Sequence, residues 1–467
     1  MQFLATRLML GLARIFLLSL LALHQTQAQV NRTPSAPPLT GCRIEAVNYK
    51  GWEAQQVSNR WVQLIVVPQN GGRLMQVTFA GHSYLFVNPK FAGQYLPPNP
   101  RKWFNYGGDK LWPLPEGNND EQHWTGGSDV LDDGWFTFRK ISEGPQCEIE
   151  LTGPPDPQTG IQFLRTIRID ADTPRIQFRA TMKNATGHSI EWSMQSVTQY
   201  DTAEASPPAR MNHNFWTFTS ANPSSSYLNR YHVRFGPAEN PAASVRDDGL
   251  FSLHYVHMAA ELWLDSTEGW LAVVDGSTQY AMVERFRYDQ TKSYPGKASV
   301  IFWTNGPELR VNNDGEAALS SGEEGQPPYY LEAELNSPLC RLPPGETCEM
   351  ETEWFPTRAG SEFHGATEAG ILMRPLRATL LQDRRIKLSG SFGVFYAGRL
   401  VARLYDDHGA LLETMPILEV NPTEAVTLDK EIFPNGKAAR LSLHLEDSNG
   451  VDRGSLQEVQ VSKAENR

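Results

Sequence analysis

The chain of 467 residues carries a formal net charge of -11, with 20% charged and 40% hydrophobic residues. This length predicts roughly two or three domains, each able to bury a core of its own. An acidic chain of ordinary globular composition is not expected to bind nucleic acid, because phosphate binding needs clustered Lys and Arg.

The first 28 residues predict a signal peptide. Arg7 and Arg14 supply positive charge, and an uninterrupted apolar run follows from Ile15 to Leu23. A small-x-small cleavage site then ends at Ala28, so the mature chain is expected to begin near Gln29. The apolar run is shorter than the roughly 20 residues that span a bilayer, and no other stretch reaches that length. We therefore expect export to the periplasm or the cell exterior, with no transmembrane anchor.

A polar, Pro-containing stretch over residues 29–43 predicts a linker. Leu39 to Cys42 has the letters of a bacterial lipobox, whose Cys would be lipidated. A lipobox follows the apolar run directly, however, and here a polar stretch separates them. We therefore expect Cys42 to lie in or near the first strand.

Four cysteines in an exported chain can form disulfides. Cys340 and Cys348 flank a predicted hairpin turn, which favours their pairing and leaves Cys42 with Cys147. Spacing alone does not fix the connectivity. Metal binding is the weaker alternative, because neither pair has CxxC spacing and no His cluster accompanies them.

Short strands and turns dominate the sequence from Cys42 to residue 357. Trp61 to Pro68 is typical of a buried strand, and a turn follows at Asn70-Gly71-Gly72. Long amphipathic helices are nearly absent, so residues 44–357 predict one large all-β antiparallel sandwich. Further strands are expected at residues 74–79, 84–87, 162–169, 175–182, 270–274, 298–303 and 329–335.

Residues 358–376 break the strand pattern and predict a second linker. Beyond it, Leu441, Leu443 and Leu445 alternate with polar residues, as in a half-buried strand. Other strands are expected at residues 400–405, 425–428 and 457–461. Short strands at this spacing over residues 377–467 predict a small Ig-like β-sandwich.

The segment from Trp103 to Trp135 has the composition of a carbohydrate site. It holds four of the chain's 12 tryptophans, interleaved with glycines, carboxylates and a lysine. Sugar rings present apolar faces and hydroxyl edges, which suit flat aromatic side chains beside polar groups. The competing interpretation is that the tryptophans are core residues and that Asp109 pairs with Lys110 or caps a turn. The candidate sugar-binding residues are Trp103, Asn105, Tyr106, Asp109, Lys110 and Trp112.

Two predicted strands add candidates. Along residues 191–201, alternation places Gln195 opposite the face of Trp192 and Met194, which fits a binding strand or a solvated one equally. Along residues 330–335, Glu332 and Glu334 share a face about 7 Å apart, where they could divide acid–base work or simply face solvent. The histidines form no ligand cluster, and no nucleotide-binding or nucleophile motif is present, so we expect neither metal nor cofactor.

Several motifs in order give the sequence a family resemblance. It resembles an exported bacterial family known as a domain of unknown function, which is itself similar to the galactose-mutarotase-like, carbohydrate-binding supersandwich superfamily. The resemblance covers residues 44–357. The motifs are Val67–Leu74, Phe86–Pro89, Trp103–Pro113, Tyr294–Pro295, Tyr330–Leu339 and Leu342–Thr347.

The resemblance implies a supersandwich whose concave sheet receives a sugar. Mutarotases of the superfamily use a His acid and a Glu base, and Glu332 best matches that Glu. No His occurs in residues 195–200, where the acid is expected, and His188 lies earlier in the chain. This departure argues against mutarotase activity by the usual route.

The leading hypothesis is therefore an exported carbohydrate-recognition protein, with Arg285 and Glu332 supporting the aromatic segment. The first alternative is an epimerase, lyase or hydrolase on the same scaffold, with Glu332 or Asp109 as the catalytic base and Lys110 neutralising developing charge. The second alternative is a structural protein of the cell envelope, since Ig-like modules often serve as spacers.

Overall fold

The computed structural model describes residues 41–99, 102–117, 123–126, 129–205, 209–307, 309–311, 317–319, 327–382 and 384–463. The predicted signal peptide and most of the first predicted linker lie outside these residues. Among the residues described, no helix has the length and apolar character needed to cross a membrane.

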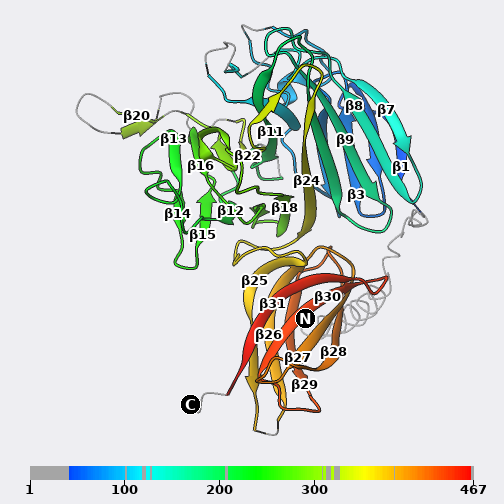
Figure 1. Ribbon diagram of the computed structural model, residues 1–467, viewed down its shortest axis with the longest axis vertical. Helices are drawn as coiled ribbons and strands as arrows, with labels where there is room; N and C mark the ends of the chain where they lie inside the picture. Colours follow the sequence, from blue (N-terminus) through cyan, green and yellow to red (C-terminus); the bar gives the residue numbers. More distant parts are fainter. Residues whose placement is uncertain are drawn as a thin grey trace, which may run out of the picture. The chain divides into compact units, whose positions relative to one another are not determined.

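The fold is all-β, as the sequence predicts, and its largest element is a 12-stranded antiparallel sheet (Figure 1). Ten strands follow one another across it, and β5 (His82–Ser83) and β23 (Cys340–Leu342) pair at its side with β4 and β11. In spatial order the ten are β1 (Arg43–Tyr49), β2 (Trp52–Ser58), β3 (Val62–Val67), β4 (Arg73–Phe79), β6 (Asp109–Leu114), β11 (Ile190–Asp201), β22 (Tyr330–Asn336), β19 (Val300–Thr304), β16 (Ala260–Leu264) and β13 (His232–Phe235).

A second, 10-stranded antiparallel sheet packs against the first. One hydrophobic core contains side chains from both sheets, which defines a sandwich. The spatial order is β14 (Ala243–Val245), β15 (Leu250–His254), β12 (Phe215–Ser220), β17 (Trp270–Asp275), β18 (Tyr280–Phe286), β24 (Thr347–Arg358), β10 (Ile176–Asn184), β9 (Ile161–Asp170), β8 (Gln146–Thr152) and β7 (Thr137–Ser142).

Strand β9 shows how the sequence specifies this packing. Every second residue is buried, starting with Ile161 and Phe163 and ending with Ile167 and Ile169. Each such side chain contributes roughly 1.5–3 kcal/mol when it leaves water. The exception in this apolar row is Arg165, which is buried between the two sheets and needs a charged partner there.

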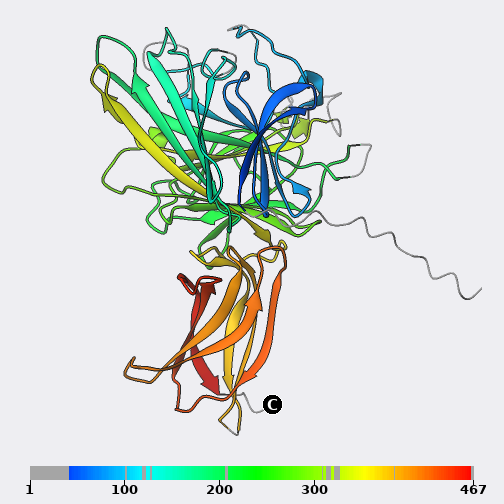
Figure 2. The same ribbon diagram turned by 90° about the vertical axis from the view of Figure 1, so that its right-hand side faces the viewer.

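The C-terminal residues form a 7-stranded sheet, and its buried side chains, Leu441, Leu443 and Leu445 among them, share one hydrophobic cluster with residues of the 10-stranded sheet such as Phe218 and Trp270. Its order is β28 (Leu411–Val420), β27 (Gly398–Tyr405), β30 (Arg440–Asp447), β31 (Asp452–Lys463), β25 (Gly370–Leu380), β26 (Ile386–Val394) and β29 (Val426–Ile432). Smaller elements are the hairpin of β20 (Leu309–Val311) and β21 (Ala317–Leu319), and the 3-10 turns η1 (Pro89–Phe91) and η2 (Pro295–Lys297). Figure 2 shows the same strands from the side.

The two predicted linkers overlap strands at their ends. Arg43 already belongs to β1, and the second predicted linker reaches into β25, which begins at Gly370. Both expected disulfides are present, Cys42 with Cys147 and Cys340 with Cys348. Cys42 lies directly before β1 and is joined by its disulfide to β8, in agreement with the expectation that it lies in or near the first strand.

Candidate functional site

The site is built from residues that face one another across neighbouring strands of the 12-stranded sheet. In a first row, Glu334 of β22 lies opposite Val197 of β11 and Ile301 of β19. Val197 in turn faces Lys110 of β6, and Ile301 faces Trp263 of β16. Directly opposed residues project from the same face of a sheet, so this row places a carboxyl group between a lysine and a tryptophan.

A second row lies two residues away along the same strands. Glu332 of β22 faces Gln199 of β11 on one side and Trp303 of β19 on the other. Trp303 in turn lies opposite Glu261 of β16. Together the two rows alternate carboxyl, amide and aromatic side chains across one face of the sheet.

A cleft of about 430 Å³ opens over these rows. Its size lies within the roughly 300–1,000 Å³ of small-molecule sites. The lining includes Trp103, Trp112, Trp263, Trp303, Tyr330, Gln195, Arg234, Glu116, Glu261, Glu332 and Glu334.

The floor of the cleft holds two glutamates in different surroundings. Glu332 accepts a hydrogen bond from Gln199 Nε2 at 2.5 Å and lies 3.6 Å from Lys110 Nζ. Glu334 accepts a hydrogen bond from the side-chain amide of Gln195 but has no ion-pair partner within 4 Å among the described residues. Burial, reinforced by the negative charge of Glu332, raises the pKa of Glu334 well above its usual value. Glu334 therefore holds its proton to a higher pH than an exposed glutamate does, and it lies next to a carboxyl group paired with a lysine.

Two more glutamates approach from the sides of the cleft. Desolvation raises the pKa of Glu261, while its hydrogen bond from Trp263 Nε1 opposes the rise. Glu116 is crowded by protein atoms, and this desolvation, with the charges of Glu261 and Glu332, raises its pKa to about 7. Because the Glu116 side chain is also open to the cleft, water offsets part of that desolvation, whereas Glu334 is buried.

The aromatic walls are held in place from behind. Trp112 donates its indole N–H to Asp132 Oδ1 at 2.8 Å, and the same oxygen accepts from Arg73 at 2.7 Å. Lys110 Nζ lies 4.3 Å from the centroid of the Trp112 ring, within cation–π range. Trp103 meets Trp112 edge to face at 6.4 Å and leaves 44% of its surface exposed. The cleft thus presents a fixed indole and a more accessible one on the same side.

Five of the candidates predicted from the sequence come together here. Trp103, Trp112, Gln195 and Glu332 line the cleft, and Lys110 lies directly beneath them, paired with Glu332. They reach the site from β6, β11, β22 and the segment before β6, so the strand order brings them together.

Two candidates lie beside the cleft. Burial raises the pKa of the hydroxyl of Tyr330 in the lining, and Asn105 lies close enough to oppose that rise, while Asn105 Oδ1 accepts a hydrogen bond from the Gly107 N–H at 3.2 Å. Tyr106 is fully buried, and its ring packs against Trp52 while its hydroxyl accepts from the Leu96 N–H at 3.0 Å. The side chain of Tyr106 is part of a core and does not line the cleft.

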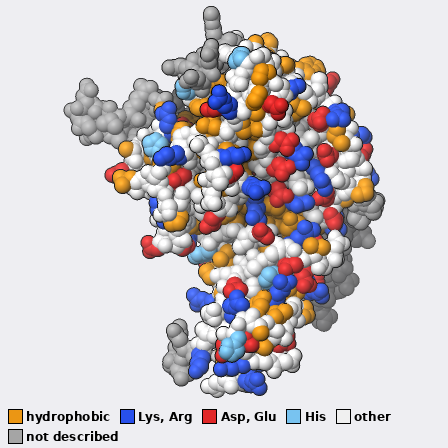
Figure 3. Space-filling model, in the orientation of Figure 1, with side chains coloured by type: hydrophobic (Ala, Val, Ile, Leu, Met, Phe, Trp, Pro, Cys, Tyr) orange, Lys and Arg blue, Asp and Glu red, His pale blue; other side chains and the backbone are white. Residues whose placement is uncertain are grey.

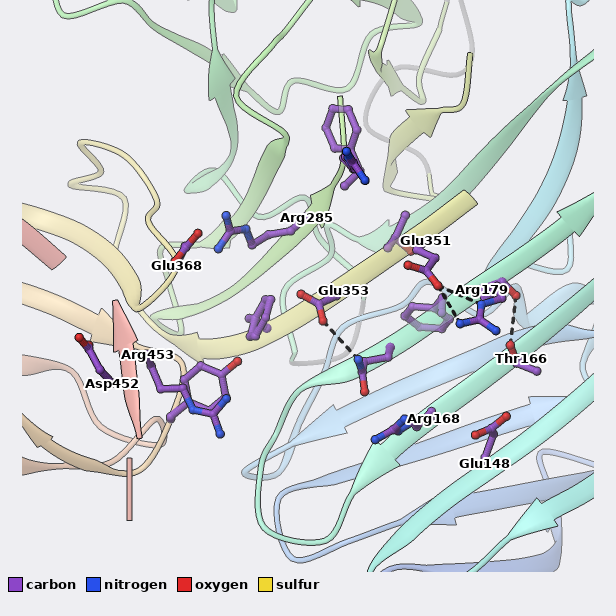
Figure 4. A pocket seen from close by; sticks show the side chains of 17 residues that line it. Glu148, Thr166, Arg168, Arg179, Arg285, Glu351, Glu353, Glu368, Asp452 and Arg453 are labelled. Atoms are coloured by element: carbon purple, nitrogen blue, oxygen red, sulfur yellow. Dashed lines mark hydrogen bonds and ion pairs between the residues drawn. The ribbon is translucent and has the colours of Figure 1, made fainter. Parts of the chain in front are cut away.

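Asp109 and Arg285 lie elsewhere. Successive residues of a strand point to opposite faces, so Asp109 points between the sheets while Lys110 points toward the cleft. Asp109 there pairs with Arg165. Arg285 lies on β18 in the other sheet and lines a separate charged cavity of about 720 Å³ (Figure 4). That cavity includes Glu353 and Glu368, and Figure 3 shows acidic and basic side chains interspersed over this face of the molecule.

Several residues of the cleft were not among the sequence candidates. Glu261 and Trp263 come from β16, Trp303 from β19 and Arg234 from β13, while Glu116 follows β6. Glu261, Trp263, Trp303 and Arg234 lie far along the chain from the Trp103–Trp135 segment. Glu116 lies just beyond the Trp103–Pro113 motif. The sequence signal that could have identified Glu261 and Trp263 is the alternation of side chains along β16. Both occupy the less buried positions of this otherwise apolar strand.

The fold and the site thus define a class of protein: a large all-β sandwich with an acidic, aromatic cleft on one sheet. A scan against protein-family models finds no match, and a search of curated proteins finds none either. Solved structures show a likeness of fold at low sequence identity.

A galactose mutarotase-like protein from Clostridium acetobutylicum is 8% identical with a TM-score of 0.43, covering 68% of this chain and 100% of that one. A galactose mutarotase related enzyme from Lactobacillus acidophilus is 10% identical with a TM-score of 0.40, covering 66% and 98%. A TPR-domain containing protein from Parabacteroides distasonis is 13% identical with a TM-score of 0.41; the match covers 66% of this chain but 47% of that longer one.

Proposed function

We propose that this chain is an exported carbohydrate-recognition protein that binds a sugar in the cleft of the 12-stranded sheet. The observation that carries the proposal is the arrangement of Trp103, Trp263 and Trp303 around a floor of carboxyl and amide groups. Indole faces suit the C–H faces of a pyranose ring, and Glu332 and Gln195 suit its hydroxyl edges.

Export is supported by the cysteines. The two disulfides account for all four cysteines of the chain. Structural disulfides persist in oxidising compartments such as the periplasm and the cell exterior. Together with the predicted cleavage site near Ala28, this favours a periplasmic or secreted protein.

Replacing Trp263 with Ala is expected to weaken sugar binding about tenfold. The change removes a stacking face worth about 1–1.5 kcal/mol, which corresponds to that factor in the dissociation constant. A glycan array with the mature chain, residues 29–467, would identify the sugar, and calorimetry would compare the variants. Trp135→Ala is the matched control, because Trp135 is 68% exposed and does not line the cleft. Equal losses in both variants, or no loss in either, would contradict the assignment of the cleft.

A second candidate function, catalysis on the bound sugar, is favoured by one observation. Glu332 pairs with Lys110, while burial and the charge of Glu332 raise the pKa of Glu334, two residues along the strand. Two neighbouring carboxyl groups in such different surroundings can divide the roles of base and acid, as an epimerase, lyase or hydrolase requires.

If the bound sugar is converted, Glu332→Gln should lower turnover by about two orders of magnitude or more, because the amide cannot accept a proton. Product analysis of each glycan that binds would show whether turnover occurs at all. Glu351→Gln is the control, since Glu351 is 65% exposed in an ion pair with Arg179 on the other sheet. A Glu332→Gln protein that retained full turnover would exclude Glu332 as the base.

A further inference from the structure

The cleft contains more carboxyl groups than cations. Glu116, Glu261, Glu332 and Glu334 line it, whereas Arg234 is the one cationic residue among its described lining. Lys110 lies beneath and is paired with Glu332. The Arg234 guanidinium, over the Trp263 ring at 5.9 Å, acts on Glu261 and Glu116. Glu334 is left without a counter-ion of its own.

Hydrogen bonding in the floor shows the same imbalance. Gln195 is 2% exposed, and its side-chain amide N–H already donates a hydrogen bond to Glu334. Its Oε1 accepts no hydrogen bond from any described residue. Gln199 Oε1, behind Glu332, likewise accepts none. A buried carbonyl oxygen without a donor costs about 1–3 kcal/mol. Two amide oxygens at the floor therefore lack a donor among the described residues, and Lys110 Nζ beneath them is a buried donor that also makes no hydrogen bond there.

We propose that the sugar bound in the cleft carries a free, protonated amine, and that its ammonium group lies between Glu334 and Gln195 Oε1. This inference rests on the proposed function and specifies its substrate class. An ammonium group supplies three N–H donors and the missing positive charge at once. A neutral hydroxyl supplies one donor and no charge, and a uronic acid would add a further negative charge beside four glutamates.

The aromatic walls fit the same ligand. Trp263 belongs to the first floor row, next to Ile301, and Trp303 belongs to the second, next to Glu332. The ring of an amino sugar can stack on an indole while its cation also approaches the aromatic face, which adds a cation–π attraction. An N-acetyl group removes the charge and two of the three donors and enlarges the substituent, so acetylation of the same sugar should weaken binding.

Proton release is expected to accompany binding. Glu334 is faced by Glu332 on its own strand, Glu261 on β16, Glu116 after β6 and Lys110 on β6, so four of these five groups are acidic. Burial and mutual repulsion raise the pKa values of Glu334 and Glu116, that of Glu116 to about 7. An arriving ammonium group favours the ionised carboxylates, and the displaced protons enter solution.

The test is calorimetry of the mature chain near pH 7 with glucose, galactose and mannose, each in its 2-hydroxyl, 2-amino and 2-acetamido form. For at least one sugar, the amino form should bind about tenfold more tightly than both others. Titrations in buffers of different ionisation enthalpy should show proton release for the amino form alone.

Glu334→Gln should remove the preference for the amine, and Glu116→Gln, at the open side of the cleft, gives a second variant if the first fails to fold. Glu351→Gln should retain the preference. A hydroxyl or acetamido form that binds as tightly as the amine would overturn the inference and leave the proposed function standing. Absence of binding by all the forms would overturn both.

Discussion

Replacing Asp109 with Ala should lower the free energy of unfolding by about 3–5 kcal/mol, the cost of removing one partner of a buried ion pair. Asp109 is fully buried on β6, and Arg165, on β9 of the other sheet, is 3% exposed. The guanidinium donates to Asp109 Oδ1, and the hydroxyls of Ser196 and Thr198 donate to Oδ2 at 3.2 and 3.1 Å. In the variant the guanidinium would stay buried without its counter-charge.

A double variant separates the ion pair from simple packing. Removing both charges with Asp109→Leu and Arg165→Met should recover most of the loss, because an uncharged pair of similar volume has no buried charge to compensate. Urea unfolding of the single and double variants measures the coupling between the two positions. Arg179→Ala is the control, since the Arg179–Glu351 pair is exposed and should contribute less than about 1 kcal/mol.

The same variants test whether Asp109 takes part in sugar binding. Because its side chain points between the sheets, Asp109→Asn in its folded form should bind the sugar with the affinity of the wild-type chain. A loss of affinity without a loss of stability would contradict the structural role and restore Asp109 as a site residue.

Local patterns were sufficient to predict much of this fold. The apolar run at residues 61–68 corresponds to β3, and the alternation at residues 330–335 corresponds to β22, with Glu332 and Glu334 on one face as expected. Such patterns are readable because side chains alternate with a period of two along every strand. Single strands and their faces therefore follow from sequence.

The glycine-rich string before Lys110 shows where local patterns fail. Asp109 and Lys110 are adjacent and both fit a sugar site by composition, but β6 begins at Asp109. Gly107 and Gly108 have φ angles of 90° and 75°, and a Cβ on Gly107 would lie 2.2 Å from the Phe86 carbonyl oxygen. These glycines are required by close backbone packing. Once the segment is a strand, Asp109 and Lys110 cannot share a face.

The far side of the cleft depends on strand order, which no short segment contains. Trp303 and Glu261 reach Glu332 because β19 and β16 follow β22 across the sheet, although all three are separated along the chain. This pairing is decided by the packing of the whole sandwich. Arg285 was a sequence candidate for the site, but the strand that carries Glu284, Arg285 and Phe286 belongs to the other sheet.

Replacing Glu284 with Gln should make the protein more stable at pH 8 by a few kcal/mol and leave its stability at pH 5 nearly unchanged. Glu284 is fully buried on β18, where its Oε1 accepts the Tyr200 hydroxyl at 2.6 Å. Desolvation, opposed by this hydrogen bond and reinforced by the charge of Asp109, raises the pKa of Glu284 to about 8.

The direction of the effect follows from proton linkage. Between the unfolded pKa of 4.5 and the folded value of about 8, the native state holds a proton on Glu284 that the unfolded state has lost. Unfolding then releases a proton, so the wild-type chain loses stability as pH rises through this window, by up to about 1.4 kcal/mol per unit. The contribution of protonated Glu284 to the free energy of unfolding is fully present below about pH 4.5. Gln is neutral in both states and carries no such dependence.

Urea unfolding of both chains at about pH 5, 6.5 and 8 measures the difference directly, since every other titrating group is common to the two proteins. Glu349→Gln, at a position 54% exposed in the same sheet, should leave the pH profile unchanged. Asp109→Asn should lower the upper end of the pH range over which the wild-type chain loses stability, because removing that negative charge lowers the pKa of Glu284. A constant stability difference between Glu284→Gln and wild type at all three pH values would mean that Glu284 is ionised in the folded protein. The interior between the sheets would then hold two carboxylates, at Asp109 and Glu284, beside one guanidinium.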